Sequence, residues 1–217
     1  MSTPTCYLTR ALIVPRTLYA RGLNDAYAWH QLVWRAFPGH DGETRDFLTR
    51  LDDKPNGTQL LIVSPTEPTR PDWLGESDEW QSKAIPTGFF QARRYHFQLH
   101  ANPTVKRVVR DVAGNRKKNG RREAITGEPN LRAWLQRKGD VGGFRLAGAV
   151  PLEVFSDISR FTKKPKGGQS MSGTHHAVDF TGILEVTDPA IFLTHTFATG
   201  IGSAKAFGFG LLVLAPA

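Results

Sequence analysis

The sequence predicts an α+β protein made of two small domains in tandem rather than one built on a single sheet. Segments typical of strands and helices alternate along both halves, and the second half follows an order close to β-α-β-β-α-β. The chain has 217 residues, of which 40% are hydrophobic and 10% aromatic, so it can bury a real core. We expect one domain over residues 1–88 and a second over residues 92–217.

The first predicted elements are a strand and a helix. Residues 6–14 alternate in polarity and are rich in residues that favour strands. Asn24 or Asp25 can cap the helix that follows, whose apolar residues recur at helical spacing until Pro38. We expect a second, short helix over residues 43–51.

A turn and a less regular segment complete the first half. The sequence Pro-Asn-Gly at residues 55–57 predicts a turn that leads into a strand over residues 59–63. Residues 64–86 carry prolines, acidic residues and two tryptophans without a sustained period. This composition predicts a loop that includes a candidate edge strand.

The second half opens with a clearly alternating strand over residues 93–99. The other elements expected in this half are a helix over residues 131–138, strands over residues 144–155, 177–186 and 207–214, and a short helix over residues 189–199.

The charge of the chain indicates an acidic partner. Its 28 Lys and Arg against 20 Asp and Glu give a formal net charge of +8, which suits nucleic acid, a membrane surface or simple colloidal repulsion. Cys6 is the only cysteine, which excludes an internal disulfide and a cysteine-based zinc site. No apolar run approaches the roughly 20 residues of a membrane-spanning helix, and no secretory signal is visible. We therefore expect a soluble, cytoplasmic protein with no cofactor and no membrane partner.

Two basic segments concentrate the charge. Residues 104–122 hold many Lys and Arg and a single Asp, which is typical of a mobile arm that neutralises phosphates, or of a solvated loop with no partner. Residues 160–168 lie between two predicted strands and should project as a hairpin. Two such segments in one chain favour a nucleic-acid partner. Their candidate binding side chains are Arg116, Lys117, Lys118, Arg160, Lys163, Lys164 and Lys166.

Tyr27 and His30 are the candidate catalytic residues. They are three residues apart in the predicted helix and therefore share one helical face. Histidine changes protonation near neutral pH and a phenol can hydrogen-bond, so the pair suits general acid–base work on a hydroxyl. The alternative is structural, with Tyr27 in the core and His30 capping a turn or facing water.

A glycine-rich segment at residues 200–210 is the most distinctive local feature. Four glycines around Lys205 would let backbone N–H groups approach an anion, although a tight turn before the last strand explains them too. The segment matches neither the P-loop nor the dinucleotide-binding pattern. Its candidate binding residues are Gly202, Ser203 and Lys205. The pair His175-His176 has no metal-ligand partners at motif spacing and is expected to be a surface pair.

Taken together, six segments resemble the CasE family of CRISPR-associated endoribonucleases in their order along nearly the whole chain. They are residues 27–38, 45–48, 97–103, 133–138, 180–186 and 200–212. Each segment is weak alone, but six in the family's order are specific. The resemblance implies two tandem ferredoxin-like domains of the RRM or RAMP type, with antiparallel sheets and a glycine-rich loop in the second domain.

The resemblance also implies a reaction. Family members cut the repeat hairpin of CRISPR precursor RNA without a metal, by attack of a 2′-hydroxyl that leaves a 2′,3′-cyclic phosphate and a 5′-hydroxyl. They then keep the hairpin of the mature crRNA as a subunit of the Cascade complex, so the implied partners are this RNA and other Cascade subunits. The family's catalytic histidine falls on His30 and its tyrosine on Tyr27.

The sequence departs from the family pattern at residues 19–23, in the long segment 64–80 and at Ser203, and these departures leave the catalytic assignment intact. Two alternatives stay open. One is a catalytically inactive RNA-hairpin-binding module with the same fold, and the other is a scaffold subunit whose charge serves assembly alone.

Overall fold

The fold is seen in a computed structural model of the chain. It describes residues 6–23, 26–39, 44–108, 114, 121–148, 152–163 and 171–217, and only the backbone at residues 121, 160–163, 171 and 172. Within these ranges, no helix is both long and apolar enough to cross a membrane.

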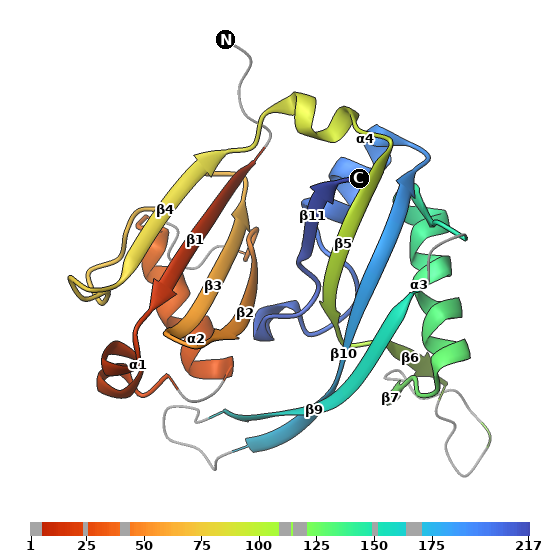
Figure 1. The fold of residues 1–217 in the computed structure, drawn as a ribbon. Helices are drawn as coiled ribbons and strands as arrows, with labels where there is room; N and C mark the ends of the chain where they lie inside the picture. The colour runs from red at the N-terminus through yellow and green to blue at the C-terminus, as the bar shows by residue number, and fades with distance from the viewer. Residues whose placement is uncertain are drawn as a thin grey trace.

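The first half of the chain forms a four-stranded antiparallel sheet in the order β2-β3-β1-β4 (Figure 1). Its strands are β1 (Tyr7–Ile13), β2 (Leu48–Lys54), β3 (Gly57–Ser64) and β4 (Glu79–Ala84). Strand β1 is central, with β3 on one side and β4 on the other. Strands β1 and β3 confirm the strands predicted over residues 6–14 and 59–63. Strand β4 confirms the edge strand predicted within residues 64–86.

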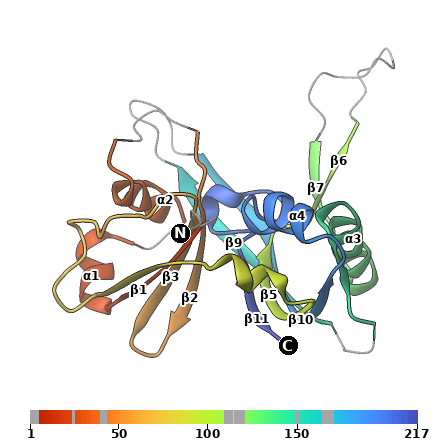
Figure 2. The ribbon, with the colours of Figure 1, turned by 90° about the horizontal axis from the view of Figure 1, so that it is seen from above.

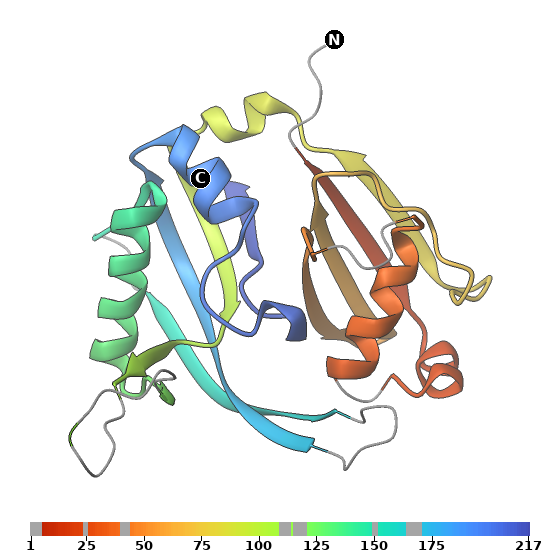
Figure 3. The same ribbon diagram turned by 180° about the vertical axis from the view of Figure 1, so that it is seen from behind.

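Helix α2 (Ala26–Val33) covers one face of this sheet and continues into η1 (Trp34–Ala36) (Figure 3). Residues two apart in a strand point to the same face, so alternate positions of β1 and β3 meet the helix. The side chains that form this core include Ala11, Ile13, Leu60, Ile62, Trp29 and Val33. The helix that carries the candidate catalytic pair is therefore fixed by its apolar face.

A helix that the sequence did not predict, α1 (Pro15–Arg21), follows β1 directly. Its proline lies in the first turn, where the missing N–H costs no helical hydrogen bond. Gly22, with φ of 61°, ends the helix in the left-handed conformation. Pro15 thus marks the start of a helix as well as the end of a strand.

The predicted helix over residues 43–51 is wrong. Residues 48–51 belong to β2, which forms a hairpin with β3 in which Lys54 lies opposite Gly57. The turn at residues 55–57 brings the two flanking segments together as paired strands. Pairing along the whole hairpin outweighs the weak local preference of residues 48–51 for helix.

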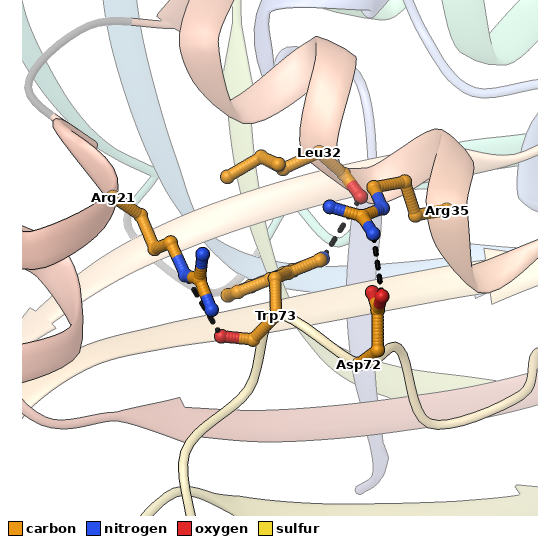
Figure 4. Close-up of polar contacts among 5 residues, drawn as sticks. All are labelled: Arg21, Leu32, Arg35, Asp72 and Trp73. Atoms are coloured by element: carbon orange, nitrogen blue, oxygen red, sulfur yellow. Dashed lines mark hydrogen bonds and ion pairs between the residues drawn. The ribbon is translucent and has the colours of Figure 1, made fainter.

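The loop between β3 and β4 contains no helix or strand and braces α2 instead (Figure 4). The Nε1 of Trp73 donates to the carbonyl oxygen of Leu32 near the end of α2, at 3.0 Å. Arg21 Nε donates to the carbonyl oxygen of Trp73 at 3.2 Å, and Arg35 pairs with Asp72 at 2.6 Å. One buried indole thus ties the loop to α2.

The second half forms an antiparallel sheet in the order β11-β5-β10-β8, with β9 also paired to β10. Its strands are β5 (Arg94–Ala101), β8 (Phe144–Leu146), β9 (Glu153–Lys163), β10 (Met171–Val186) and β11 (Leu212–Pro216). Strands β8 and β9 pair with successive stretches of β10, so they occupy one strand position. With these two counted as one, both sheets have the strand order 4-1-3-2 of a ferredoxin-like domain.

Two predicted strands of this half need correction. The strand expected over residues 144–155 is interrupted between β8 and β9. The strand expected over residues 207–214 begins only at Leu212, because residues before it belong to the glycine-rich loop and the short helix η4 (Lys205–Phe207). Continuous apolar runs concealed both changes of structure.

The helices of the second half confirm their predictions. Helix α3 (Glu128–Gly142) packs Leu131 and Trp134 into the core, and the ring of Trp134 stacks on Phe180 at 5.9 Å between centroids. The short helix α4 (Pro189–Ile191) continues as the π-helical η3 (Phe192–Phe197).

The two sheets share part of their core. Helix η2 (Thr87–Gln91) connects β4 to β5. One cluster of buried side chains combines Leu48 and Val63 of the first half with Phe97 and Phe197 of the second. The halves are therefore packed against each other, not merely tethered.

Two hairpins leave the second sheet. Strands β6 (Thr104–Arg107) and β7 (Arg121–Ala124) form a separate pair that projects from the body of the molecule (Figure 2). The first basic segment, predicted as a mobile arm, thus has paired strands at its two ends. The hairpin of β9 and β10 extends past the sheet toward the first half, and β9 contacts α2 (Figures 1 and 3).

Candidate active site

Helix α2 carries both predicted catalytic side chains, and both are half-buried. Gln31 Nε2 donates to the phenol oxygen of Tyr27 at 3.2 Å. The ring of His30 meets Trp34 edge-on, with 6.4 Å between centroids. Contacts along the same helical segment therefore orient the two side chains, three residues apart.

The surroundings of His30 favour its neutral form. Burial is the larger cause and the positive charge of Arg45 the smaller, and both lower the pKa of His30 below its ordinary 6.5. Near neutral pH the imidazole is therefore mostly uncharged, which is the form that accepts a proton.

The glycine-rich loop of the second half reaches the first half beside this helix. Its short helix η4 contacts both α2 and β2. Arg45 Nη1 donates to the carbonyl oxygen of Lys205 at 2.6 Å. Gly200 has φ of 74°, and a Cβ there would lie 2.8 Å from Leu48, so glycine lets the loop approach β2 this closely.

The base of the loop is held by the end of β5. Ser203 Oγ donates to the carbonyl oxygen of Asn102 at 3.0 Å and lies 3.1 Å from Thr104 Oγ1. Gly202, with φ of 94°, lies against the ring of Trp134. Both residues therefore shape the loop from within, and direct RNA contact by them stays a prediction.

The expectation of a surface histidine pair is wrong for His175. Its ring packs against Phe207 and Phe209 at 5.0 and 5.6 Å between centroids, and Asn102 Nδ2 donates to its Nδ1 at 3.0 Å. Burial lowers the pKa of His175. Strand β10 runs further back along the chain than the predicted strand, so His175 supports the loop.

Two cavities lie where the halves meet. One of about 460 Å³ is lined by Arg45, Asp46 and Lys205 together with Ser64. The other, of about 370 Å³, joins α2 to the second half; among its lining residues are Ala26, Trp29, His100, Ser159 and Phe207. The candidate site is thus built by both halves of the chain.

The second basic segment begins beside this site. Arg160 and Lys163 lie in the last part of β9, whose backbone pairs with β10 as far as Lys163 opposite Met171. Ser159, next to Arg160, lines the same cavity as α2. The other predicted basic residues, Lys164, Lys166, Arg116, Lys117 and Lys118, lie outside the described residues.

Sequence reasoning missed Arg45 as a member of the site. It did place the residue in one of the six family-like segments, 45–48, and that placement is the signal that could have found it. Its hydrogen bond to Lys205 spans 160 residues of sequence, which no local pattern reveals.

A family model described as CRISPR associated protein matches residues 6–216, nearly the whole chain. The chain belongs to this CRISPR-associated family. The match confirms the resemblance drawn from the six segments and covers both halves of the candidate site.

Two relatives of this CRISPR-associated chain carry names that describe activity or assembly. The CRISPR-associated endoribonuclease Cse3 of Thermus thermophilus is 30% identical over 97% of this chain and 100% of its own length. The CRISPR system Cascade subunit CasE of Escherichia coli is 31% identical over 88% of this chain and 92% of its own. The chain is therefore similar to a protein named CasE over most of its length.

A solved structure supports the same membership. Thermus thermophilus Cse3 bound to an RNA representing a pre-cleavage complex superposes with a TM-score of 0.71 at 28% identity, over 98% of this chain and 100% of that one. The predicted fold of two tandem ferredoxin-like domains with antiparallel sheets is confirmed by this match and by the shared strand order.

Proposed function

We propose that this chain is an endoribonuclease that cuts the repeat hairpin of CRISPR precursor RNA and then holds the crRNA hairpin as a Cascade subunit. The observation that carries the proposal is the place of His30, half-buried on α2 where the Lys205 loop of the second half meets the first. The names of the relatives, an endoribonuclease and a Cascade subunit, support it.

The proposed reaction uses the RNA's own hydroxyl and no metal. The 2′-oxygen upstream of the scissile phosphate attacks phosphorus in line, and the bond to the 5′-oxygen of the next nucleotide breaks. Neutral His30 accepts the proton of the 2′-hydroxyl while water protonates the departing oxygen, or protonated His30 donates to the departing oxygen while water takes the proton of the 2′-hydroxyl. Tyr27 orients the hydroxyl or the phosphate, and Lys205 offsets charge that grows on the phosphoryl oxygens. The products carry a 2′,3′-cyclic phosphate and a 5′-hydroxyl.

In this proposal, the basic segments bind the RNA hairpin. An A-form stem hides its base edges in a deep, narrow groove, so phosphate contacts and shape dominate along it. Arg160 and Lys163 belong to a hairpin that starts beside α2. An RNA stem bound along this β9–β10 hairpin would have one of its ends at the candidate site.

The two proposed domains have different roles in this reaction. Residues 1–88 carry the catalytic helix, and residues 92–217 carry the basic segments and the glycine-rich loop. In support, each sheet completes its own strand order on one side of η2.

Cleavage of the cognate repeat RNA in excess EDTA tests the proposal directly. We expect cutting at one position, with a 2′,3′-cyclic phosphate and a 5′-hydroxyl at the new ends, and no cutting of RNA with a 2′-deoxy substitution there. The ends are identified by mass spectrometry. Tight binding without cleavage would instead favour the inactive RNA-hairpin-binding module, and cutting of the deoxy substrate would exclude the 2′-hydroxyl as nucleophile.

Neutralising the second basic segment should weaken RNA binding and flatten its dependence on salt. Each phosphate that a lysine no longer neutralises lowers the slope of log K against log salt by about 0.7 to 0.9, so replacing Lys163, Lys164 and Lys166 with Gln should lower it by roughly 2. Filter binding at several salt concentrations measures the slope. Lys54→Gln with Lys83→Gln, at exposed positions of the first sheet, is the control. An unchanged slope in the triple variant would remove this segment from the interface.

A further inference from the structure

Arg45 is a half-buried cation that the proposed mechanism does not yet use. Its guanidinium lies 5.5 Å from the ring centroid of Phe47 and donates to the carbonyl oxygen of Lys205 at 2.6 Å. That hydrogen bond engages one of the five N–H groups of the guanidinium. The side chain is thus held in place while retaining donors for a further acceptor.

Arg45 and Lys205 line the same cavity, and in the described part of the chain neither forms an ion pair with an acid. Burial lowers the pKa of Arg45 to about 10. Burial and the charges of Arg45 and Lys138 lower the pKa of Lys205. Two partly buried like charges that line one cavity are unfavourable in the free protein, and an anion bound in that cavity would relieve the repulsion.

The anion that fits is a phosphate diester. A guanidinium offers N–H groups at the spacing of two phosphoryl oxygens, and an ammonium adds a compact charge. The cavity of about 460 Å³ has room for such a group. Because η4, which begins at Lys205, contacts α2, a phosphate held here would lie near the helix that carries His30.

We propose that Arg45 is a further substrate-binding residue, which holds the scissile phosphate of the RNA together with Lys205. This inference rests on the proposed function. It gives Arg45 two linked tasks, since the same guanidinium fixes the Lys205 backbone from the first half and contacts the phosphate. The segment before β2 thus supplies a second cation beside Lys205.

The test is Arg45→Gln, assayed by single-turnover cleavage of the cognate repeat RNA. We expect the rate to fall about 10²-fold, as when one preorganised donor to a developing oxyanion is removed. Loss of the positive charge should raise the pKa of His30, so the limb of the pH–rate profile that His30 governs should move to higher pH. Free guanidinium ion should restore part of the rate of Arg45→Ala. Arg10→Gln, which removes a half-buried arginine of β1 paired with Glu79, is the matched control and should cut normally.

The outcomes separate the two proposals. If the unmodified protein fails to cut the repeat RNA, the proposed function is wrong. If it cuts, and Arg45→Gln cuts within threefold of the same rate with an unmoved pH profile, the role of Arg45 is overturned while the function stands. A slower variant with a lower melting temperature, an unmoved profile and no rescue by guanidinium would show Arg45 to be only a joint between the halves, which also overturns the inference.

Discussion

Replacing His30 with Ala is expected to slow single-turnover cleavage of the repeat RNA by about 10²- to 10⁴-fold, the usual worth of general acid–base help. Affinity for the RNA should change little, because burial and Arg45 keep His30 mostly uncharged near neutral pH. The rate is measured with excess protein, and the affinity with RNA that carries a 2′-deoxy group at the cut.

His96→Ala is the matched control for this experiment, since His96 is an exposed histidine on β5. It should leave the cleavage rate unchanged. Equal losses of binding and cutting in His30→Ala would contradict a catalytic role and would make His30 part of the RNA-binding surface instead.

Replacing Trp73 with Ala is expected to lower the free energy of unfolding by about 3 to 5 kcal/mol. The side chain is only 1% exposed, meets Trp29 edge-on at 6.4 Å between centroids, and donates from its Nε1 to Leu32. Its removal leaves a cavity under α2 and an unsatisfied carbonyl at the end of that helix. Urea unfolding followed by circular dichroism measures the loss.

Two variants show where this effect comes from. Trp73→Phe keeps much of the buried ring but removes the hydrogen bond, so it should cost less than Trp73→Ala. Trp80→Ala alters a half-buried tryptophan on the edge strand β4 and should also cost less. A loss below about 1 kcal/mol in Trp73→Ala would mean that the loop does not brace α2.

The order of strands and helices was largely predictable because alternation along a strand and helical spacing are local properties. The strand at residues 6–14 and the helices at residues 131–138 and 189–199 were found in this way. The helix predicted over residues 43–51 was wrong, because residues 48–51 pair with β3 across a turn. The interruption between β8 and β9 was also hidden, since both pieces pair with the same strand.

The site divides in the same way. Tyr27 and His30 stand three residues apart on one helix, so their common position follows from spacing. Arg45 and Lys205 are 160 residues apart, and His175 joins the site through its packing against Phe207 and Phe209 and its hydrogen bond with Asn102. Sequence can place groups that share an element, whereas the convergence of two halves requires the packed fold.

The short connection through η2 has a consequence for how the site comes together. Arg45 and Lys205 belong to halves of the chain that Thr87–Gln91 links directly. A short tether keeps two surfaces at an effective concentration on the order of millimolar, so a modest contact area is enough to keep them joined. If the chain were severed at η2, the two pieces would have to find each other by diffusion. Catalysis would then fall with dilution, although every residue of the site was intact.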